Sequence, residues 1–148
     1  MPRHSRLTLN VAGIYGIGLL LIGLWPTHVD KNVNVVGSAP VQWMIRHLDL
    51  APTTAYNVIE FSANVALFVP LGVLAMTLSR RSRWMHVVLL GFIVSSAVEI
   101  FQNVARPDRT ASWVDVLANT SGTAVGTVLV VLWRVRHAVV TRHVAKPR

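Results

Sequence analysis

Acidic and carboxamide side chains recur in pairs along this chain, at spacings that place both members of a pair on one face of a helix. The pairs are Glu60 and Asn64, Glu99 and Gln102, and Asp115 and Asn119. Residues three or four positions apart in a helix lie one turn apart on the same side. Carboxylates can act as general bases or bind hard cations, and carboxamides both donate and accept hydrogen bonds. These six residues are therefore the first candidates for chemistry.

The segments that carry these pairs are long and apolar enough to cross a lipid bilayer. Of the 148 residues, 53% are hydrophobic and only 14% are charged, and the mean hydropathy is +0.51. A bilayer core about 30 Å thick needs roughly 20 mostly apolar helical residues. Four stretches qualify: residues 7–25, 58–78, 84–104 and 113–133. The sequence therefore predicts an all-α fold, a four-helix transmembrane bundle that forms one domain over residues 1–148.

Tryptophans mark the ends of these segments. Trp25, Trp84, Trp113 and Trp133 all fall at segment ends, where an indole ring is favoured at the level of the lipid headgroups. No small-residue cleavage site follows the first segment, so we expect it to be a retained helix and not a signal peptide.

The basic residues predict the orientation of the chain. Ten of the 14 Lys and Arg residues precede the first segment, separate the second from the third, or follow the fourth. Short loops rich in Lys and Arg stay in the cytoplasm, so we expect both termini to be cytoplasmic in a multi-pass protein of the bacterial plasma membrane. The net charge of +8 then reflects topology and attraction to anionic membrane lipids, and it does not indicate a nucleic-acid partner. The absence of cysteine excludes a disulfide scaffold and cysteine-ligated zinc.

A further helix is expected in the long outer loop between the first two segments, residues 26–57. Apolar residues recur there at helical spacing, at Val41, Met44, Ile45 and Leu48. Pro40 suits the first turn of a helix, and Pro52 limits its far end. The pattern predicts a short helix that lies on the outer membrane surface. The basic tail, residues 134–148, is expected to extend the fourth helix by a turn or two.

With this topology the polar pairs lie at a similar depth, near the outer membrane surface. Glu60, Glu99 and Asp115 each lie near the outer end of a segment, and Arg106, Asp108 and Arg109 occupy the outer loop above them. The sequence predicts a polar pocket open to the outer leaflet, which binds a lipid headgroup, a peptide or a cation. Its expected ligand-binding residues are Glu60, Asn64, Glu99, Gln102, Arg109, Asp115 and Asn119.

Two alternatives to a ligand pocket remain open. An arginine of the outer loop could neutralise Glu99 or Asp115 while the carboxamides bond between helices, so that the polar groups only stabilise packing. Glu60, Glu99 and Asp115 could also hold a hard cation, but the sequence does not show that they converge, and we predict no metal site and no cofactor. No activated nucleophile is evident, so whether the protein is an enzyme stays open, with a non-enzymatic role favoured.

Proline and glycine residues are expected to shape the helix packing. Pro70 should free the carbonyl of Ala66 and kink the second segment, and Gly72 follows it. Gly122 and Gly126 form a small-residue face of the Gly-x-x-x-Gly type. That face can pack within the chain or between chains, so a homo-oligomer stays open. Gly13 and Gly16, together with Gly23, are expected to serve similarly in the first segment.

Three blocks of the sequence resemble the VanZ-like family of small bacterial membrane proteins. They are Asn64-x-x-x-Phe68-x-Pro70-x-Gly72, then Glu99-x-x-Gln102, then Arg109-x-x-Ser112-x-x-Asp115-x-x-x-Asn119-x-x-Gly122-x-x-x-Gly126. The resemblance runs from about Asp30 to Gly126. The family is named for an accessory protein of glycopeptide resistance that lowers susceptibility to teicoplanin.

The resemblance implies a role in the bacterial cell envelope. We expect a lipid or a glycopeptide- or lipopeptide-type ligand at the outer-leaflet pocket, and a contribution to envelope or teicoplanin-type antibiotic tolerance. Two other functions stay open. One is a membrane enzyme that acts on a lipid-linked envelope substrate by carboxylate or metal-assisted catalysis. The other is a structural subunit whose helices pack into a larger membrane complex.

Overall fold

The computed structural model describes residues 3–23, 36–78, 83–105 and 112–144, and these residues form α-helices joined by short turns, with no strand among them. Its helices are α1 (Arg3–Gly23), α2 (Ala39–Leu48), α3 (Pro52–Leu78), α4 (Trp84–Ala105) and α5 (Trp113–Val144). Three of them, α3, α4 and α5, are long and apolar enough to cross a membrane, whereas the apolar stretch of α1, Arg6–Ile22, is shorter. The all-α prediction is confirmed for the described residues, and a fourth membrane span stays a prediction.

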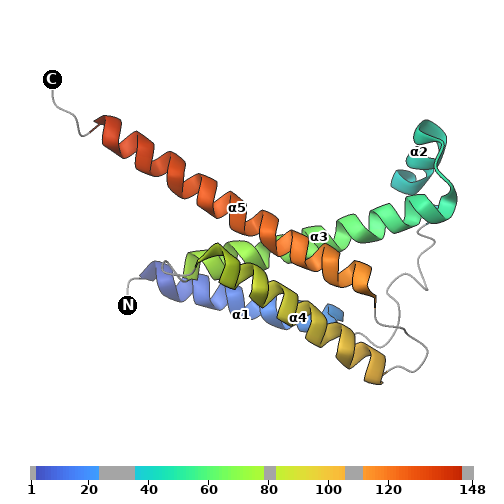
Figure 1. The fold of residues 1–148 in the computed structure, drawn as a ribbon, viewed down its shortest axis with the longest axis horizontal. Helices are drawn as coiled ribbons and strands as arrows, with labels where there is room; N and C mark the ends of the chain where they lie inside the picture. The colour runs from blue at the N-terminus through green and yellow to red at the C-terminus, as the bar shows by residue number, and fades with distance from the viewer. Residues whose placement is uncertain (1–2, 24–35, 79–82, 106–111, 145–148) are drawn as a thin grey trace.

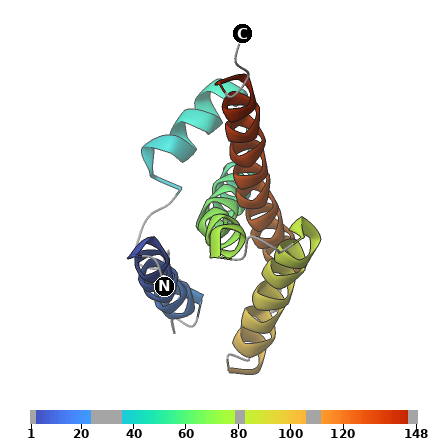
Figure 2. The same cartoon turned by 90° about the vertical axis from the view of Figure 1, so that its left-hand side faces the viewer.

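The long helices alternate in direction. Figure 1 shows α1 and α4 running one way and α3 and α5 the other, so that the beginning of α1 and the end of α5 lie toward the same end of the structure. In Figure 2, α3 lies between α1 on one side and α4 and α5 on the other. The most extensive packing is between α3 and α5, followed by that of α4 on α5. Helix α5 is therefore the element against which both α3 and α4 pack.

Glycines bring the backbones of α3 and α5 into direct contact. A β-carbon added at Gly122 would overlap the carbonyl oxygen of Val65, and one at Gly126 would overlap that of Val69. Helix α3 contributes a glycine of its own, Gly72, which lies against the backbone of α5 at Thr123. Because the residue numbers of the two partners rise together, α3 and α5 are parallel. The small-residue face predicted from Gly122 and Gly126 thus packs within the chain, and it does so with Gly72.

Helix α4 packs on α5 in the antiparallel sense. Gly91 of α4 faces the side chain of Thr123 of α5. One turn after Gly91, Ser95 contacts Asn119, which lies one turn before Thr123. A β-carbon at Gly91 would overlap the Thr123 side chain. This interface therefore places the polar side chains of α4 directly against those of α5.

Helix α3 begins at Pro52, six residues before the predicted start of the second span, so the helix is longer at this end than the span that the sequence predicts. The sequence interpretation considered Pro52 only as a limit on the preceding helix. Proline also suits the first turn of a new one. The early start is held by packing, since α2 and α3 contact each other and both Val41 of α2 and Ala55 of α3 are fully buried.

Helix α2 corresponds to the predicted short helix of the outer loop. It has Pro40 in its first turn and ends at Asp49, whose backbone is left-handed with φ 51° and ψ 38°. Aspartate tolerates this conformation better than most residues. Trp43 and Leu48 are exposed. The helix is confirmed, and its position on the membrane surface stays a prediction.

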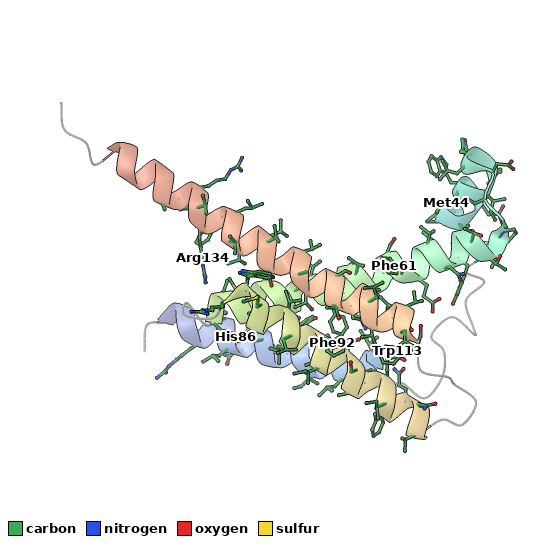
Figure 3. All side chains as sticks on the ribbon, in the orientation of Figure 1. Met44, Phe61, His86, Phe92, Trp113 and Arg134 are labelled. Carbon is green, nitrogen blue, oxygen red and sulfur yellow. The ribbon has the colours of Figure 1, made fainter. Side chains whose placement is uncertain are left out.

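Helix α5 continues well beyond the predicted end of the fourth span, through Val144. No glycine or proline interrupts residues 134–144, so nothing in the sequence ends the helix there. Arg134 donates a hydrogen bond to the carbonyl of Met76 in the last turn of α3. Figure 3 shows Arg134 and His86 toward the end of the structure where α1 begins, and Trp113 toward the other end.

Helix α1 is held mainly against α3. The hydroxyl of Tyr15 donates a hydrogen bond to the carbonyl of Leu67, at 2.8 Å, three residues before Pro70, which lies inside α3 without ending it. Among the described residues, no atom of another helix lies within 4 Å of the β-carbon positions of Gly13 and Gly16. Gly13 and Gly16 therefore mediate no close packing within the described part of the chain, packing of this face against another chain stays a prediction, and the surroundings of Gly23 lie outside what the structure describes.

Candidate functional site

The first turn of α5 is capped by Ser112, whose hydroxyl oxygen accepts the backbone N–H of Asp115 at 3.2 Å. Such a cap satisfies one of the free N–H groups at a helix start. The N–H of Ser112 itself donates to a carboxylate oxygen of Glu99 at 2.9 Å. In a capping box the residue three positions after the cap accepts that N–H. Here Glu99 of α4 accepts it, so the Asp115 carboxylate serves another contact.

That other contact links α5 to α3. The side-chain amide of Asn64 donates a hydrogen bond to Asp115 Oδ1 at 2.9 Å. Both side chains are half-buried. Asp115 lies in the first turn of α5, where the positive end of the helix dipole stabilises a carboxylate. Asp115 therefore lies where a negative charge is favoured.

A second inter-helix bond lies one turn deeper along α5. The side-chain amide of Asn119 donates to the hydroxyl oxygen of Ser95 at 2.9 Å. Ser95 is fully buried and Asn119 is 7% exposed. The carbonyl oxygen of the Asn119 side chain is buried and has no hydrogen-bond partner in the described part of the chain.

Together these contacts define one group of side chains from three helices, which we call the polar cluster. Its members are Asn64, Ser95, Glu99, Ser112, Asp115 and Asn119. The polar face of α5 extends below it through Thr123 and Thr127, whose hydroxyls donate to the carbonyls of Asn119 and Thr123 in their own helix. The polar contacts between helices are thus concentrated near the start of α5.

The polar cluster contains four of the seven residues predicted from the sequence: Asn64, Glu99, Asp115 and Asn119. Gln102 lies one turn after Glu99 on α4 and is buried. Glu60 lies one turn before Asn64 on α3 and is half-buried. Arg109, with Arg106 and Asp108, lies outside the described residues.

A three-carboxylate cation site is not assembled in the described part of the chain. Within those residues, no group of three His, Cys, Asp or Glu side chains lies close enough to hold a metal ion. Glu60, Glu99 and Asp115 therefore do not form the hard-cation site that was considered from the sequence. To a ligand, the polar cluster offers carboxylate and hydroxyl oxygens together with carboxamide groups.

Two members of the polar cluster, Ser95 and Ser112, were not predicted as site residues. Ser95 lies one turn before Glu99, on the same face of α4, and that spacing is the signal that could have found it. Ser112 and Asp115 have the spacing of a capping box, which indicates a helix start but not the contact with Glu99.

The three sequence blocks that suggested a family are the blocks that the polar cluster joins, since it takes Asn64 from the first, Glu99 from the second and Ser112, Asp115 and Asn119 from the third. The VanZ/LLP1 family model matches residues 11–134. The chain belongs to the VanZ/LLP1 family. The VanZ/LLP1 match includes every residue of the polar cluster and the glycines that join α3 to α5. No curated protein and no solved structure matches the chain.

Proposed function

We propose that this VanZ-like membrane protein binds a lipid or a glycopeptide- or lipopeptide-type ligand at the polar cluster. The binding takes place in the outer leaflet of the bacterial plasma membrane and contributes to envelope or teicoplanin-type antibiotic tolerance. The chain forms one domain with four spans and both termini in the cytoplasm. The observation that supports this function best is that α3, α4 and α5 each contribute polar side chains to a single cluster.

Helix packing alone is a weak reason to keep these groups. A hydrogen bond between membrane helices contributes only about 0.6 kcal/mol on average. Burial of an ionised carboxylate costs several kcal/mol, and well-packed apolar side chains often give equal or greater stability. Glu99 is only 5% exposed. The α3–α5 pair is already locked by glycine contacts, so a binding role accounts for the carboxylates better than packing does.

The distribution of charge supports a position on the outer side. The polar cluster lies where α5 begins, and Arg134 lies near the opposite end of its apolar stretch, beside the end of α3. Figure 3 shows Trp113 and Arg134 at opposite ends of this region. Because basic residues mark the cytoplasmic side, the polar cluster faces the outer leaflet.

The test replaces the carboxylates with isosteric amides in a strain from which the native gene is deleted. Glu99→Gln and Asp115→Asn remove charge and retain side-chain acceptors. Cells are challenged with lipoglycopeptides and other envelope-active peptides, and the amount of protein in the membrane is measured in parallel. We expect both variants to insert normally and to lose protection.

The matched control is Ser62→Ala. Ser62 is an exposed polar residue on α3 whose hydroxyl bonds to Val58 of its own helix, so its loss should leave protection unchanged. Full protection by Glu99→Gln and Asp115→Asn at normal membrane amounts would contradict the proposed function.

A further inference from the structure

The described side-chain amides of the polar cluster already donate to neighbouring side chains. The Asn119 amide donates to Ser95, and the Asn64 amide donates to Asp115. The hydroxyl of Thr123, which lies beside Asn119, donates to a backbone carbonyl of its own helix. None of these bonds reaches the carbonyl oxygen of the Asn119 side chain.

A buried acceptor is therefore left over. Among the residues that the structure describes, the side-chain Oδ1 of Asn119 has no hydrogen-bond partner, although Asn119 is more than nine-tenths buried. A buried carbonyl without a donor costs about 1–3 kcal/mol, and such a group in a native protein calls for a physical explanation. A hydrogen-bond donor supplied by a ligand is one such explanation.

The charge around Asn119 indicates which kind of donor fits. Asp115 lies one turn before it on α5, and Glu99 lies one turn beyond its partner Ser95 on α4. Ionised carboxylates only accept hydrogen bonds. An anionic group, such as a phosphate or a carboxylate, would bring more acceptors and more negative charge. A donor that carries positive charge matches both properties.

The oxygen acceptors of the polar cluster favour an organic cation over a metal ion. Hard divalent cations take about six to eight oxygen ligands in total, and the described residues contain no group of three acidic or histidine side chains placed to hold one. A primary ammonium carries three N–H donors, which two carboxylates and one carboxamide can accept. We infer that the polar cluster recognises a primary ammonium group, on a lipid headgroup or on a free amine. This inference rests on the proposed function and names the ligand chemistry of that site.

The burial of these residues suggests the order of contact. Asp115 and Asn64 are half-buried, whereas Asn119 is buried beneath them. The ammonium meets the Asp115 carboxylate first. The carbonyl oxygen of Asn119 then accepts a further N–H of the ammonium, while the Asn119 amide nitrogen keeps its bond to Ser95.

The test compares two lipids that differ in N–H donors and share the phosphate and the acyl chains. Phosphatidylethanolamine has a primary ammonium, and phosphatidylcholine has a quaternary one without N–H groups. The full-length protein in detergent is titrated with each lipid, and occupancy is read by native mass spectrometry. We expect phosphatidylethanolamine to bind at least about tenfold more tightly. Equal affinity of the wild-type protein for the two lipids would overturn the inference.

The variants locate this preference. Asp115→Asn retains the shape of the side chain and removes the charge, and Asn119→Leu removes the acceptor, so both should bring the ratio of the two affinities close to one. Thr127→Val, on the same face of α5 but two turns deeper, should keep the preference. If the preference survives both Asp115→Asn and Asn119→Leu, the assignment to the polar cluster is wrong.

Two competitors define the source and class of the cation. Displacement of phosphatidylethanolamine by millimolar phosphoethanolamine assigns recognition to the free amine, and retention of the lipid assigns it to an amine on an anchored headgroup. Either result keeps the ammonium assignment. Displacement by Mg²⁺, with loss of the headgroup preference, would replace it with a metal site.

The two proposals fail separately. Lipid preference is measured on purified protein, and protection is measured in cells. A preference for phosphatidylethanolamine in a protein whose cluster variants protect cells fully would keep the ammonium site and reject the tolerance role. Loss of protection in variants of a protein without headgroup preference would reject only the ammonium assignment.

Discussion

Glu99 on α4 accepts the backbone N–H of Ser112, which caps the first turn of α5, across 2.9 Å. The contact ties the end of one helix to the start of the next through a buried carboxylate. It also leaves the side chain of Asp115 to bind Asn64 of α3. Because Glu99 of α4 takes the place of Asp115 as the acceptor of the Ser112 N–H, three helices meet at the start of α5.

Replacement of Ser112 by alanine should destabilise the start of α5. The variant loses the hydroxyl that accepts the Asp115 N–H, and loss of a helix cap costs about 0.5–2 kcal/mol. Glu99→Gln keeps an oxygen that can accept the Ser112 N–H, so it should cost less than Ser112→Ala. Thermal unfolding in detergent, with Ser62→Ala as the control, measures the difference. A Ser112→Ala variant as stable as the control would mean that this cap does not hold the helix.

Gly126→Ala should disrupt the α3–α5 contact. The added methyl group meets the backbone carbonyl of Val69, and a backbone atom cannot move aside as the end of a flexible side chain can. Overpacking of this kind costs about 1–3 kcal/mol. The measurement is the midpoint of thermal unfolding of the purified protein.

Gly13→Ala is the matched control for this substitution. Open space surrounds Gly13, and alanine favours a helix over glycine, so this change should be neutral or slightly stabilising. Equal destabilisation by Gly13→Ala and Gly126→Ala would contradict the difference in packing between α1 and α5.

Arg134→Gln should loosen the end of α3. Arg134 donates to the Met76 carbonyl, and a cation near the last turn of a helix interacts favourably with its dipole. We expect a loss of about 1–2 kcal/mol and faster hydrogen exchange in the last turn of α3. Arg136→Gln removes the same charge from an exposed position and should change neither quantity. Identical exchange in the two variants would argue against the cap.

The proposed orientation predicts which residues are labelled from each side of the membrane. A cysteine at Ser38, just before α2, should react with an impermeant thiol reagent added to intact cells. A cysteine at His137, on the extension of α5, should react only after the cells are opened. The chain has no native cysteine, so the background is low. Labelling of both positions from outside would contradict the topology and the outer position of the polar cluster.

The sequence predicted the helical fold well, because length and apolar composition decide which segments can form long helices. It failed at the boundaries. Pro52 suits either the end of one helix or the start of the next, and packing against α2 decides between them. The extension of α5 to Val144 was underestimated because basic residues at a membrane edge fit a helix as well as a loop.

The polar site was predicted only in part, because the sequence does not show how the helices pack against one another. Spacing alone places Asp115 and Asn119 on one face, but it does not give the rotation of each helix about its axis. The pairing of Asn119 with Ser95, and of Asp115 with Asn64, depends on the glycine contacts that set the register of α5 against α3 and α4. Gly13 and Gly16 could not be distinguished from Gly122 and Gly126 by sequence, because only the packed structure shows which glycines face a neighbour.

The most direct test of the binding role is mass spectrometry of the lipids and lipopeptides that copurify with the protein from bacterial membranes. Wild-type protein and Asp115→Asn are purified in parallel, with Thr127→Val as the structural control. We predict that wild type and Thr127→Val retain one amine-bearing ligand class that Asp115→Asn has lost. The same bound molecules at the same occupancy in all three proteins would contradict the assignment of a ligand site to the polar cluster.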